Sequence, residues 1–233
     1  MSESGNLSSP NHFLNALSEW DRALVFQHSE RVDLSLGQTL MRADAPLDFV
    51  HFIEQGIVSI VAQAPGRSLE VACVGRRRLL GLHIILGRNQ SSLRAHVQIP
   101  GSALRMRAVD LHSAMAASDT FRSALLAYAS NALIDMAQNV VAAGCCNVVQ
   151  RLAGHLLELS EQLDNPSIPL THDELARALG VRRASVTLAI HVLEGERAIR
   201  SLRSLTLVTD SKKLRKLSSH EATVGVPKRR TRL

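Results

Sequence analysis

Residues 171–187 read THDELARALGVRRASVT, and this stretch carries the strongest structural signals in the C-terminal part of the chain. Thr171 stands three residues before Glu174, which is the spacing of a capping box at the start of a helix. Gly180 is free to take a positive φ and predicts a turn. A second helix begins near Arg182, and its apolar side recurs at helical spacing, at Val186, Ile190 and Leu193. Two short helices around a glycine turn predict a helix-turn-helix.

The front of the second predicted helix is rich in hydrogen-bond donors. Its first two turns carry Arg182, Arg183, Ser185 and Thr187, and the helix has no carboxylate before Glu194. Guanidinium and hydroxyl groups bind guanine edges and phosphates, and the first turns of a recognition helix enter the major groove. An acid there would repel the phosphates. The pattern therefore predicts binding to double-stranded DNA through these four residues.

A small hairpin is expected directly after the two helices. Residues 199–208 alternate between apolar and polar side chains around Arg203-Ser204. Such a hairpin is the wing of a winged helix-turn-helix, and Arg200 and Arg203 would contact the DNA backbone from it. A further helix over 148–163 precedes the unit and ends before Asn165-Pro166.

The N-terminal half has the texture of short strands. Apolar runs at 32–36, 49–53, 56–61, 69–74 and 95–99 are separated by turn signals, among them Pro65-Gly66 and Pro100-Gly101. Several short strands with regular turns predict a compact antiparallel barrel or sandwich. One amphipathic helix is expected ahead of it, over about 12–28.

A long helix is expected between the two halves, from a cap at Ser118 or Asp119 to about Ala143, with a break at Gly144. Its apolar positions are spaced alternately by three and four residues, at Leu126, Ala129, Leu133, Met136 and Val140. A seam of this kind favours packing against a second copy of the helix, and hence a homodimer. The alternative is a helix buried within a single chain.

Charge and cysteine content narrow the class of protein. The net charge of +6 favours polyanionic partners. The three cysteines, Cys73, Cys145 and Cys146, are too few and unevenly placed for a disulfide framework and suit a reducing cytoplasm. Residues 1–11 lack the pattern of a signal peptide and read as a disordered leader, and no apolar run is long enough to cross a membrane.

At these motifs the chain resembles the Crp/Fnr family of regulators, over about residues 13–215. The resemblance lies in LTHDELA (170–176), GVRRASV (180–186), GQTL (37–40) and FVHFIEQGIV (49–58). It implies an α+β fold: an N-terminal antiparallel β-roll, like the cyclic-nucleotide-binding jelly roll, then a long dimerisation helix and a C-terminal winged helix-turn-helix. The corresponding segments are 12–117 for the sensor, 118–144 for the dimer helix, 145–220 for the DNA-binding domain and 221–233 for a basic tail.

The resemblance also implies roles for single residues. Arg183 matches the family's guanine-reading arginine, Ser185 matches a phosphate contact, and Thr171 and His172 match phosphate contacts at the first helix. Two positions depart from the family. Ala184 replaces its acidic base reader and Leu188 its second base-reading arginine, so we expect a different operator. The implied partners are double-stranded DNA, a second copy of the chain and RNA polymerase, with no membrane.

The family's cyclic-nucleotide cassette is degenerate here. A glutamate that holds the ribose is replaced by Leu82, followed by His83, and the arginine that pairs with the cyclic phosphate is replaced by Leu93. Arg94 is displaced by one residue, which on a strand points it to the opposite face. We therefore expect no tight binding of cyclic AMP. No cofactor or metal is predicted, and the effector is left open.

Two further local features stand out in the sequence, and the first has two competing interpretations. Cys145-Cys146 lies at the predicted hinge, where a thiol would be able to sense oxidants, or where two small apolar residues would simply pack. The run Arg76-Arg77-Arg78 is predicted to be a solvated loop.

For the whole chain, the alternative to a DNA-binding regulator is a ligand sensor that acts mainly through protein contacts and binds DNA weakly. An enzyme is not expected, because the sequence has no nucleophile–base motif, metal spacing or phosphate loop.

Overall fold

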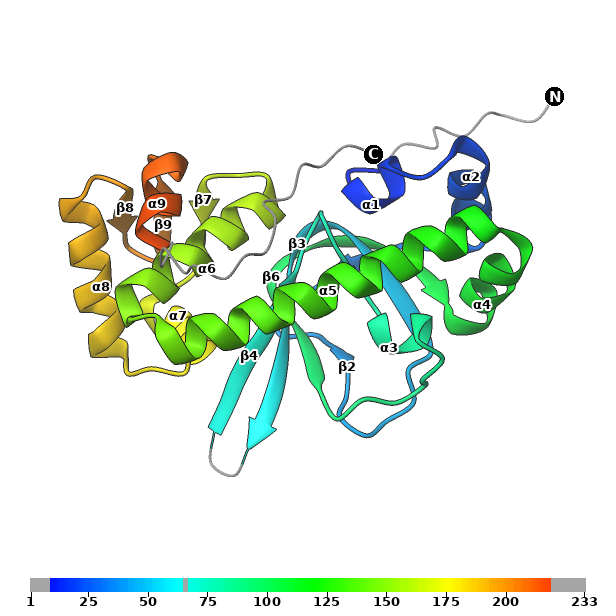
Figure 1. Cartoon of the computed structure of the whole chain (residues 1–233), viewed down its shortest axis with the longest axis horizontal. Helices are drawn as coiled ribbons and strands as arrows, with labels where there is room; N and C mark the ends of the chain where they lie inside the picture. The colour runs from blue at the N-terminus through cyan, green and yellow to red at the C-terminus, as the bar shows by residue number, and fades with distance from the viewer. Residues whose placement is uncertain (1–8, 65–66, 219–233) are drawn as a thin grey trace.

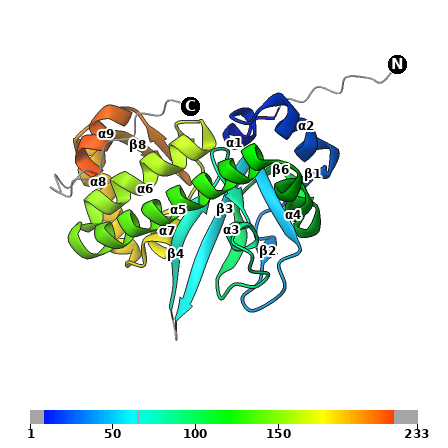
Figure 2. The ribbon, with the colours of Figure 1, turned by 45° about the vertical axis from the view of Figure 1, so that its right-hand side comes forward.

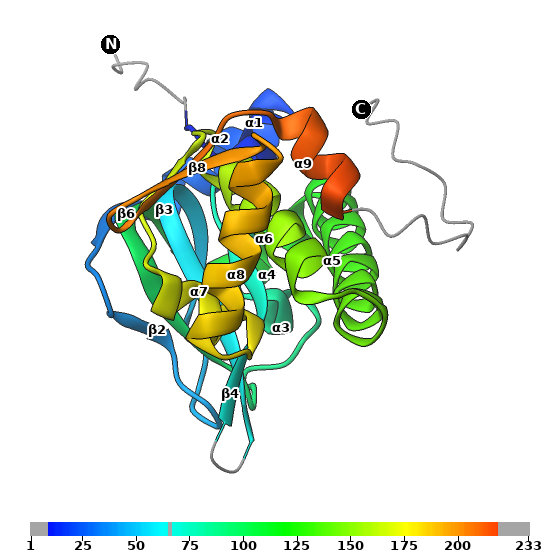
Figure 3. The same cartoon turned by 90° about the vertical axis from the view of Figure 1, so that its left-hand side faces the viewer.

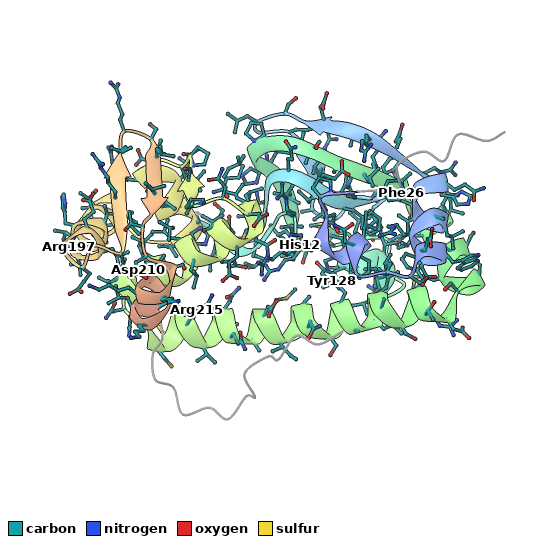
Figure 4. The ribbon with its side chains drawn as sticks, turned by 90° about the horizontal axis from the view of Figure 1, so that it is seen from above. His12, Phe26, Tyr128, Arg197, Asp210 and Arg215 are labelled. Carbon is teal, nitrogen blue, oxygen red and sulfur yellow. The ribbon has the colours of Figure 1, made fainter. Side chains whose placement is uncertain are left out.

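The chain folds into a sheet unit and a helical unit that are joined by one long helix, α5 (Asp119–Cys145) (Figure 1). The computed structural model describes residues 9–64 and 67–218. Figure 2 shows α5 crossing in front of the strands and ending among the C-terminal helices. Tyr128 points from α5 toward the sheet unit (Figure 4), where its hydroxyl donates to the Leu79 carbonyl at 2.8 Å. No helix in the described ranges is both long and apolar enough to span a bilayer.

Six strands of the described residues form one antiparallel sheet, which confirms the predicted class of the N-terminal half. Its order is β1 (Ser29–Leu34), β6 (Arg94–Arg107), β3 (Phe49–Ala64) and β4 (Arg67–Val74). Two short strands complete it, β2 (Thr39–Met41) on β6 and β5 (Leu79–Leu80) on β3. The strands enclose an apolar core that includes Val50, Phe52, Val58, Leu104 and Met106.

Two long strands stand where the sequence predicts more numerous short ones. β3 covers both the 49–53 and the 56–61 runs, and β6 continues through Pro100-Gly101, so the predicted turn there is wrong. The register between β3 and β6 shifts around Gln55, and Gly56 has a φ of +85°. A Cβ on Gly101 would overlap the backbone of Gln55. The two glycines therefore form a bulge that bends the paired strands without ending them. Pro65-Gly66 lies outside the described residues.

The N-terminal helix is also divided, into α1 (His12–Asn15) and α2 (Glu19–Gln27). Ser18 begins the second helix, because its side chain accepts a hydrogen bond from the Asp21 amide. The expected single helix over 12–28 is therefore wrong.

Part of the predicted disordered leader is ordered and buried. Ser9 donates to Glu54 at 2.8 Å, and the Asn11 side chain donates to the carbonyl of Ile53 at 2.8 Å and to that of Arg78 at 3.0 Å. Asn11 also accepts from the Leu14 amide and so caps α1. These bonds fix the chain from residue 9 onward, while residues 1–8 lie outside the described part.

Two short helices accompany the sheet before α5 begins. α3 (Leu82–Ile85) follows β5, and α4 (Ala108–Ala117) follows β6. Ser118 caps α5 by accepting from the Phe121 amide, as the sequence predicts. α5 ends at Cys145, one residue beyond the predicted break at Gly144, and Asn147 then caps the next helix.

The C-terminal unit is a winged helix-turn-helix. It begins with α6 (Val148–Leu163), whose bounds match the prediction, and continues with α7 (His172–Leu179) and α8 (Arg183–Gly195). The expected hairpin is β8 (Ile199–Leu202) and β9 (Leu205–Val208). Two elements were not predicted, β7 (Ser167–Ile168), which pairs with β9, and α9 (Ser211–Ser218), which packs on α6. Figure 3 views this unit end-on, with α8 in front.

Arg78 joins the two units, so the prediction of a solvated loop is wrong at this residue. Its guanidinium is bound to Glu158 of α6 at 2.7 Å and to Asp135 of α5 at 3.1 Å. It also donates to the Cys73 carbonyl at 2.8 Å, and its side chain is only 19% exposed. A second link comes from the Gln162 side chain, which accepts from the Gly75 amide.

Candidate nucleic-acid interface

The first helix of the candidate interface is fixed at both ends. The Thr171 side chain accepts from the Glu174 amide, and Glu174 in turn accepts from the Thr171 amide at 2.7 Å, which confirms the predicted capping box. Gly180 ends α7 with a φ of +65°, as predicted for the turn. The Val181 amide then donates to the Ala176 carbonyl at 3.0 Å and closes the turn. This local geometry sets the angle at which α8 leaves α7.

The second helix is held by one apolar side. The side chains of Val186, Ala189, Ile190 and Leu193 are almost fully buried. They pack against α6 and α7 in the core of the unit. The opposite side of α8 is open to solvent, and in the end-on view no other element covers the helix (Figure 3).

The predicted arginines lie at the exposed start of α8. Arg182 is the N-cap residue and Arg183 the first helical residue, and both are exposed. Asp173 of α7 lies 3.4 Å from the Arg183 guanidinium, a partner that the sequence did not reveal because it comes from the neighbouring helix. An exposed ion pair of this kind is weak, so the guanidinium can exchange it for another anion.

The predicted hydroxyl and imidazole groups already bind one another. His172 Nδ1 lies 3.2 Å from Thr187 Oγ1, and His172 Nε2 lies 3.4 Å from Ser201 Oγ on β8. Thr187 Oγ1 also donates to the Arg183 carbonyl at 3.2 Å. His172 thus links α7, α8 and the wing, while Ser185 stands half-buried on α8. Their packing across three elements has no signal in the local sequence.

The wing carries the remaining predicted contact. Arg203 and Ser204 make the turn between β8 and β9, and both Arg200 and Arg203 are exposed. The Glu194 carboxylate accepts from the Ser201 amide at 2.7 Å, which ties the wing to the end of α8. Seen from above, the hairpin points away from α5 (Figure 4). Arginines from α8 and from the wing are therefore exposed on one unit.

Three of the four residues of the predicted effector pocket line one cavity, and the fourth does not. Leu82, His83 and Leu93 line a cavity of about 160 Å³ between the sheet and α5. Burial lowers the pKa of His83 below its ordinary value. Arg94 does not line this cavity; it is exposed, with a guanidinium nitrogen 3.4 Å from Thr39 Oγ1. The cation nearest the cavity is instead Arg78, which is bound to two carboxylates.

The predicted dimer seam is only partly exposed. Leu126, Leu133 and Val140 are exposed at seven-residue intervals on α5. Ala129 is buried against the core of its own sheet unit, so its assignment to the seam is wrong. Met136 is half-buried and lines the cavity. Ile134 and Val141 widen the exposed stripe and were not predicted.

The three cysteines differ in their exposure to solvent. Cys73 is buried, and burial raises the pKa of its thiol well above the ordinary value. Cys145 is exposed at the end of α5, and Cys146 is half-buried in the connection to α6. The oxidant-sensing hypothesis stays a prediction for these two thiols. Within the described ranges, no group of three or more His, Cys, Asp or Glu residues is placed to hold a metal ion.

Comparisons with known proteins identify the C-terminal unit. Residues 150–217 match the family described as the Crp-like helix-turn-helix domain. No curated protein sequence matches the chain.

Solved structures extend the likeness to the sheet unit. FixK2 from Bradyrhizobium japonicum superposes with a TM-score of 0.72 at 18% identity, covering 82% of this chain and 98% of that one. TTHA1359, a Crp/Fnr-family regulator from Thermus thermophilus, gives 0.63 at 23% identity, with 81% and 98% covered. The c-di-GMP-responsive regulator CLP of Xanthomonas campestris gives 0.66 at 16% identity, with 82% and 99% covered.

TTHA1359 is described as a transcriptional regulator, and CLP as a global regulator of virulence gene expression. Residues 150–217 therefore form a Crp-like helix-turn-helix domain, and the chain as a whole has the fold of the Crp/Fnr transcription regulators.

Proposed function

We propose that the chain is a dimeric regulator of transcription that reads a two-fold symmetric DNA site through α8, without control by cyclic AMP. The observation that carries this proposal is the exposed start of α8, where Arg182 and Arg183 stand at the front of a helix fixed on its other side by a buried core.

Each predicted residue has a place in the proposed complex. Arg183 reads a guanine from the major groove, and its weak pair with Asp173 is exchanged for the base. The amide end of α7 at Thr171 and His172, the Ser185 hydroxyl and the Arg182 guanidinium bind phosphates. Thr187 holds His172 in place, and Arg203 reaches the backbone from the wing.

A second copy of the chain is needed to read a two-fold site. An exposed apolar stripe on α5 is formed by Leu126, Leu133 and Val140. A partner helix that covers this stripe would remove its apolar surface from water, which favours a dimer. Two α8 helices related by a two-fold axis would enter major grooves about 34 Å apart on one side of the duplex.

Independence from cyclic AMP rests on the chemistry of the cavity. A buried phosphate needs a cation that is free to pair with it. Arg78 is engaged by Asp135 and Glu158, and Arg94 points away. Calorimetry on the purified chain should detect no micromolar affinity for cyclic AMP.

We further expect action in the cytoplasm and contact with RNA polymerase, as in regulators of this fold.

The experiment is a selection of binding sites from a random duplex library, followed by affinity measurements on the selected duplex. Arg183→Ala should weaken specific binding by about 1–3 kcal/mol and relax the preference at one base position per half-site. Arg88→Ala removes the same charge from an exposed site in the sheet unit and should leave the base preference unchanged. An equal loss for Arg183→Ala on every sequence would contradict its role as a base reader.

A further inference from the structure

The outermost line of α8 is not the line that carries Arg183 and Thr187. Positions 184, 188 and 191 are spaced by four and three residues and so lie along one line of the helix. At about 100° per residue, this line is opposite the buried side made by Val186, Ala189, Ile190 and Leu193. Its members are Ala184, Leu188 and His191, and all three are exposed.

Leu188 is the largest apolar side chain on this line, with 68% of its surface exposed. Val192 extends the apolar surface to one side. In the end-on view α8 crosses the front of the molecule and no described element covers it (Figure 3). This apolar surface lies on the same helix as Arg182 and Arg183 and follows them along the chain.

Apart from His191, the polar side chains of α8 lie to the side of this line. Arg183 and Thr187 face α7, because the first pairs with Asp173 and the second contacts His172. A helix that enters a groove presents its outermost line to the base edges. Because the first turns of a recognition helix contact the bases and His191 lies farthest from the start of α8, the groups that would reach deepest are the isobutyl group of Leu188 and the methyl group of Ala184. Neither group donates or accepts a hydrogen bond.

The major groove contains one apolar group among the four bases, the 5-methyl group of thymine. We propose that Leu188, flanked by Ala184, recognises a thymine methyl group in each half-site. This inference rests on the proposed function, since it assumes that α8 enters the groove, and it names the base that α8 selects beyond the guanine read by Arg183.

The test scans the selected duplex with deoxyuridine, which pairs like thymine but lacks the methyl group. Removing the methyl groups that face Leu188 should weaken binding by about fourfold per half-site, the effect expected for one buried methyl group. Leu188→Ala should bind the thymine and deoxyuridine duplexes with nearly equal affinity. Leu36→Ala removes a leucine of the same exposure, 67%, from the sheet unit and should retain the full sensitivity.

A gain-of-preference variant supplies a second readout. Leu188→Arg places a guanidinium on the outermost line, and a new selection should replace the thymine by guanine at that position, because arginine binds the O6 and N7 of guanine. This result does not depend on small differences in affinity.

The outcomes separate the two proposals. If the wild-type chain selects no sequence, the proposed function fails and the inference fails with it. If it selects a site but tolerates deoxyuridine at every position, or if Leu188→Ala keeps the sensitivity, only the thymine inference is overturned. A change of oligomeric state in Leu188→Ala, with unchanged base preference, would show that a second protein surface covers this leucine and would also overturn it.

Discussion

At the scale of single residues, His51 gives the sheet core a dependence on pH. The imidazole is buried in β3, and its Nδ1 finds no hydrogen-bond partner among the described residues. Burial, with a smaller effect of Arg105, lowers the pKa of His51 to about 4. The folded chain therefore holds the neutral imidazole under conditions where an unfolded chain, with a pKa near 6.5, binds a proton.

Protonation of the unfolded chain should reduce stability between pH 6.5 and about 4. From pH 7 to pH 4.5 we expect His51 to cost about 2–3 kcal/mol of unfolding free energy. Between these two pH values, the unfolding free energy of His51→Leu should fall by about 2–3 kcal/mol less than that of the wild type. Urea unfolding of both proteins at both pH values measures this difference. Parallel pH profiles for the two proteins would show that His51 is not held neutral.

At the scale of elements, the turn between α7 and α8 depends on Gly180. Its φ is +65°, and an added Cβ would lie 2.7 Å from Leu69 Cδ1 on β4. Gly180→Ala should therefore destabilise the chain by about 1–2 kcal/mol in thermal or urea unfolding. Gly144→Ala is the matched control, since Gly144 lies within α5 and no atom crowds it. It should stabilise the chain by about 0.5 kcal/mol, and a loss of equal size in both variants would contradict the account.

Elements with local signals were predictable from the sequence. The capping box at Thr171, the glycine turn, the Ser118 cap and the bounds of α6 depend on residues within a few positions of one another, and the structure confirms them. The overall fold class is likewise confirmed, because alternation and helical spacing distinguish the strand-rich half from the helical half.

Features that depend on distant residues were not predictable. Gly56 and Gly101 form their bulge only when β3 and β6 pair, so two expected breaks became continuous strands. Asp173 approaches Arg183 only because α7 and α8 pack together. The two carboxylates that bind Arg78 lie 57 and 80 residues farther along the chain. No local sequence pattern predicts a contact across such separations.

At the scale of the whole molecule, Arg78 couples the two units. Arg78→Ala leaves Asp135 and Glu158 half-buried without their shared cation. We expect a loss of about 2–3 kcal/mol of unfolding free energy, less than for a fully buried ion pair because both carboxylates keep some contact with solvent. Arg122→Ala breaks the exposed pair with Asp119 and should cost less than about 0.5 kcal/mol. Similar losses of unfolding free energy in the two variants would show that Arg78 does not couple the two units.

The exposed stripe of α5 should set the oligomeric state. The double variant Leu133→Glu, Val140→Glu places charges where 57% and 72% of these side chains are exposed in the single chain. It should sediment as a monomer, because two charged residues would be buried without partners in the dimer. Leu36→Glu changes an exposed leucine between β1 and β2, outside α5, and should sediment like the wild type. A dimer that persists in the double variant would place the interface elsewhere.

We propose that two copies of the chain place their α8 helices in successive major grooves of one duplex. The most direct test is sedimentation of the wild-type chain with a labelled duplex taken from the selection, combined with mapping of the protected bases. We predict two chains per duplex and an inverted repeat whose half-site centres lie about 34 Å apart. One chain bound at full affinity to a single half-site, or no preference over random duplex, would contradict the account.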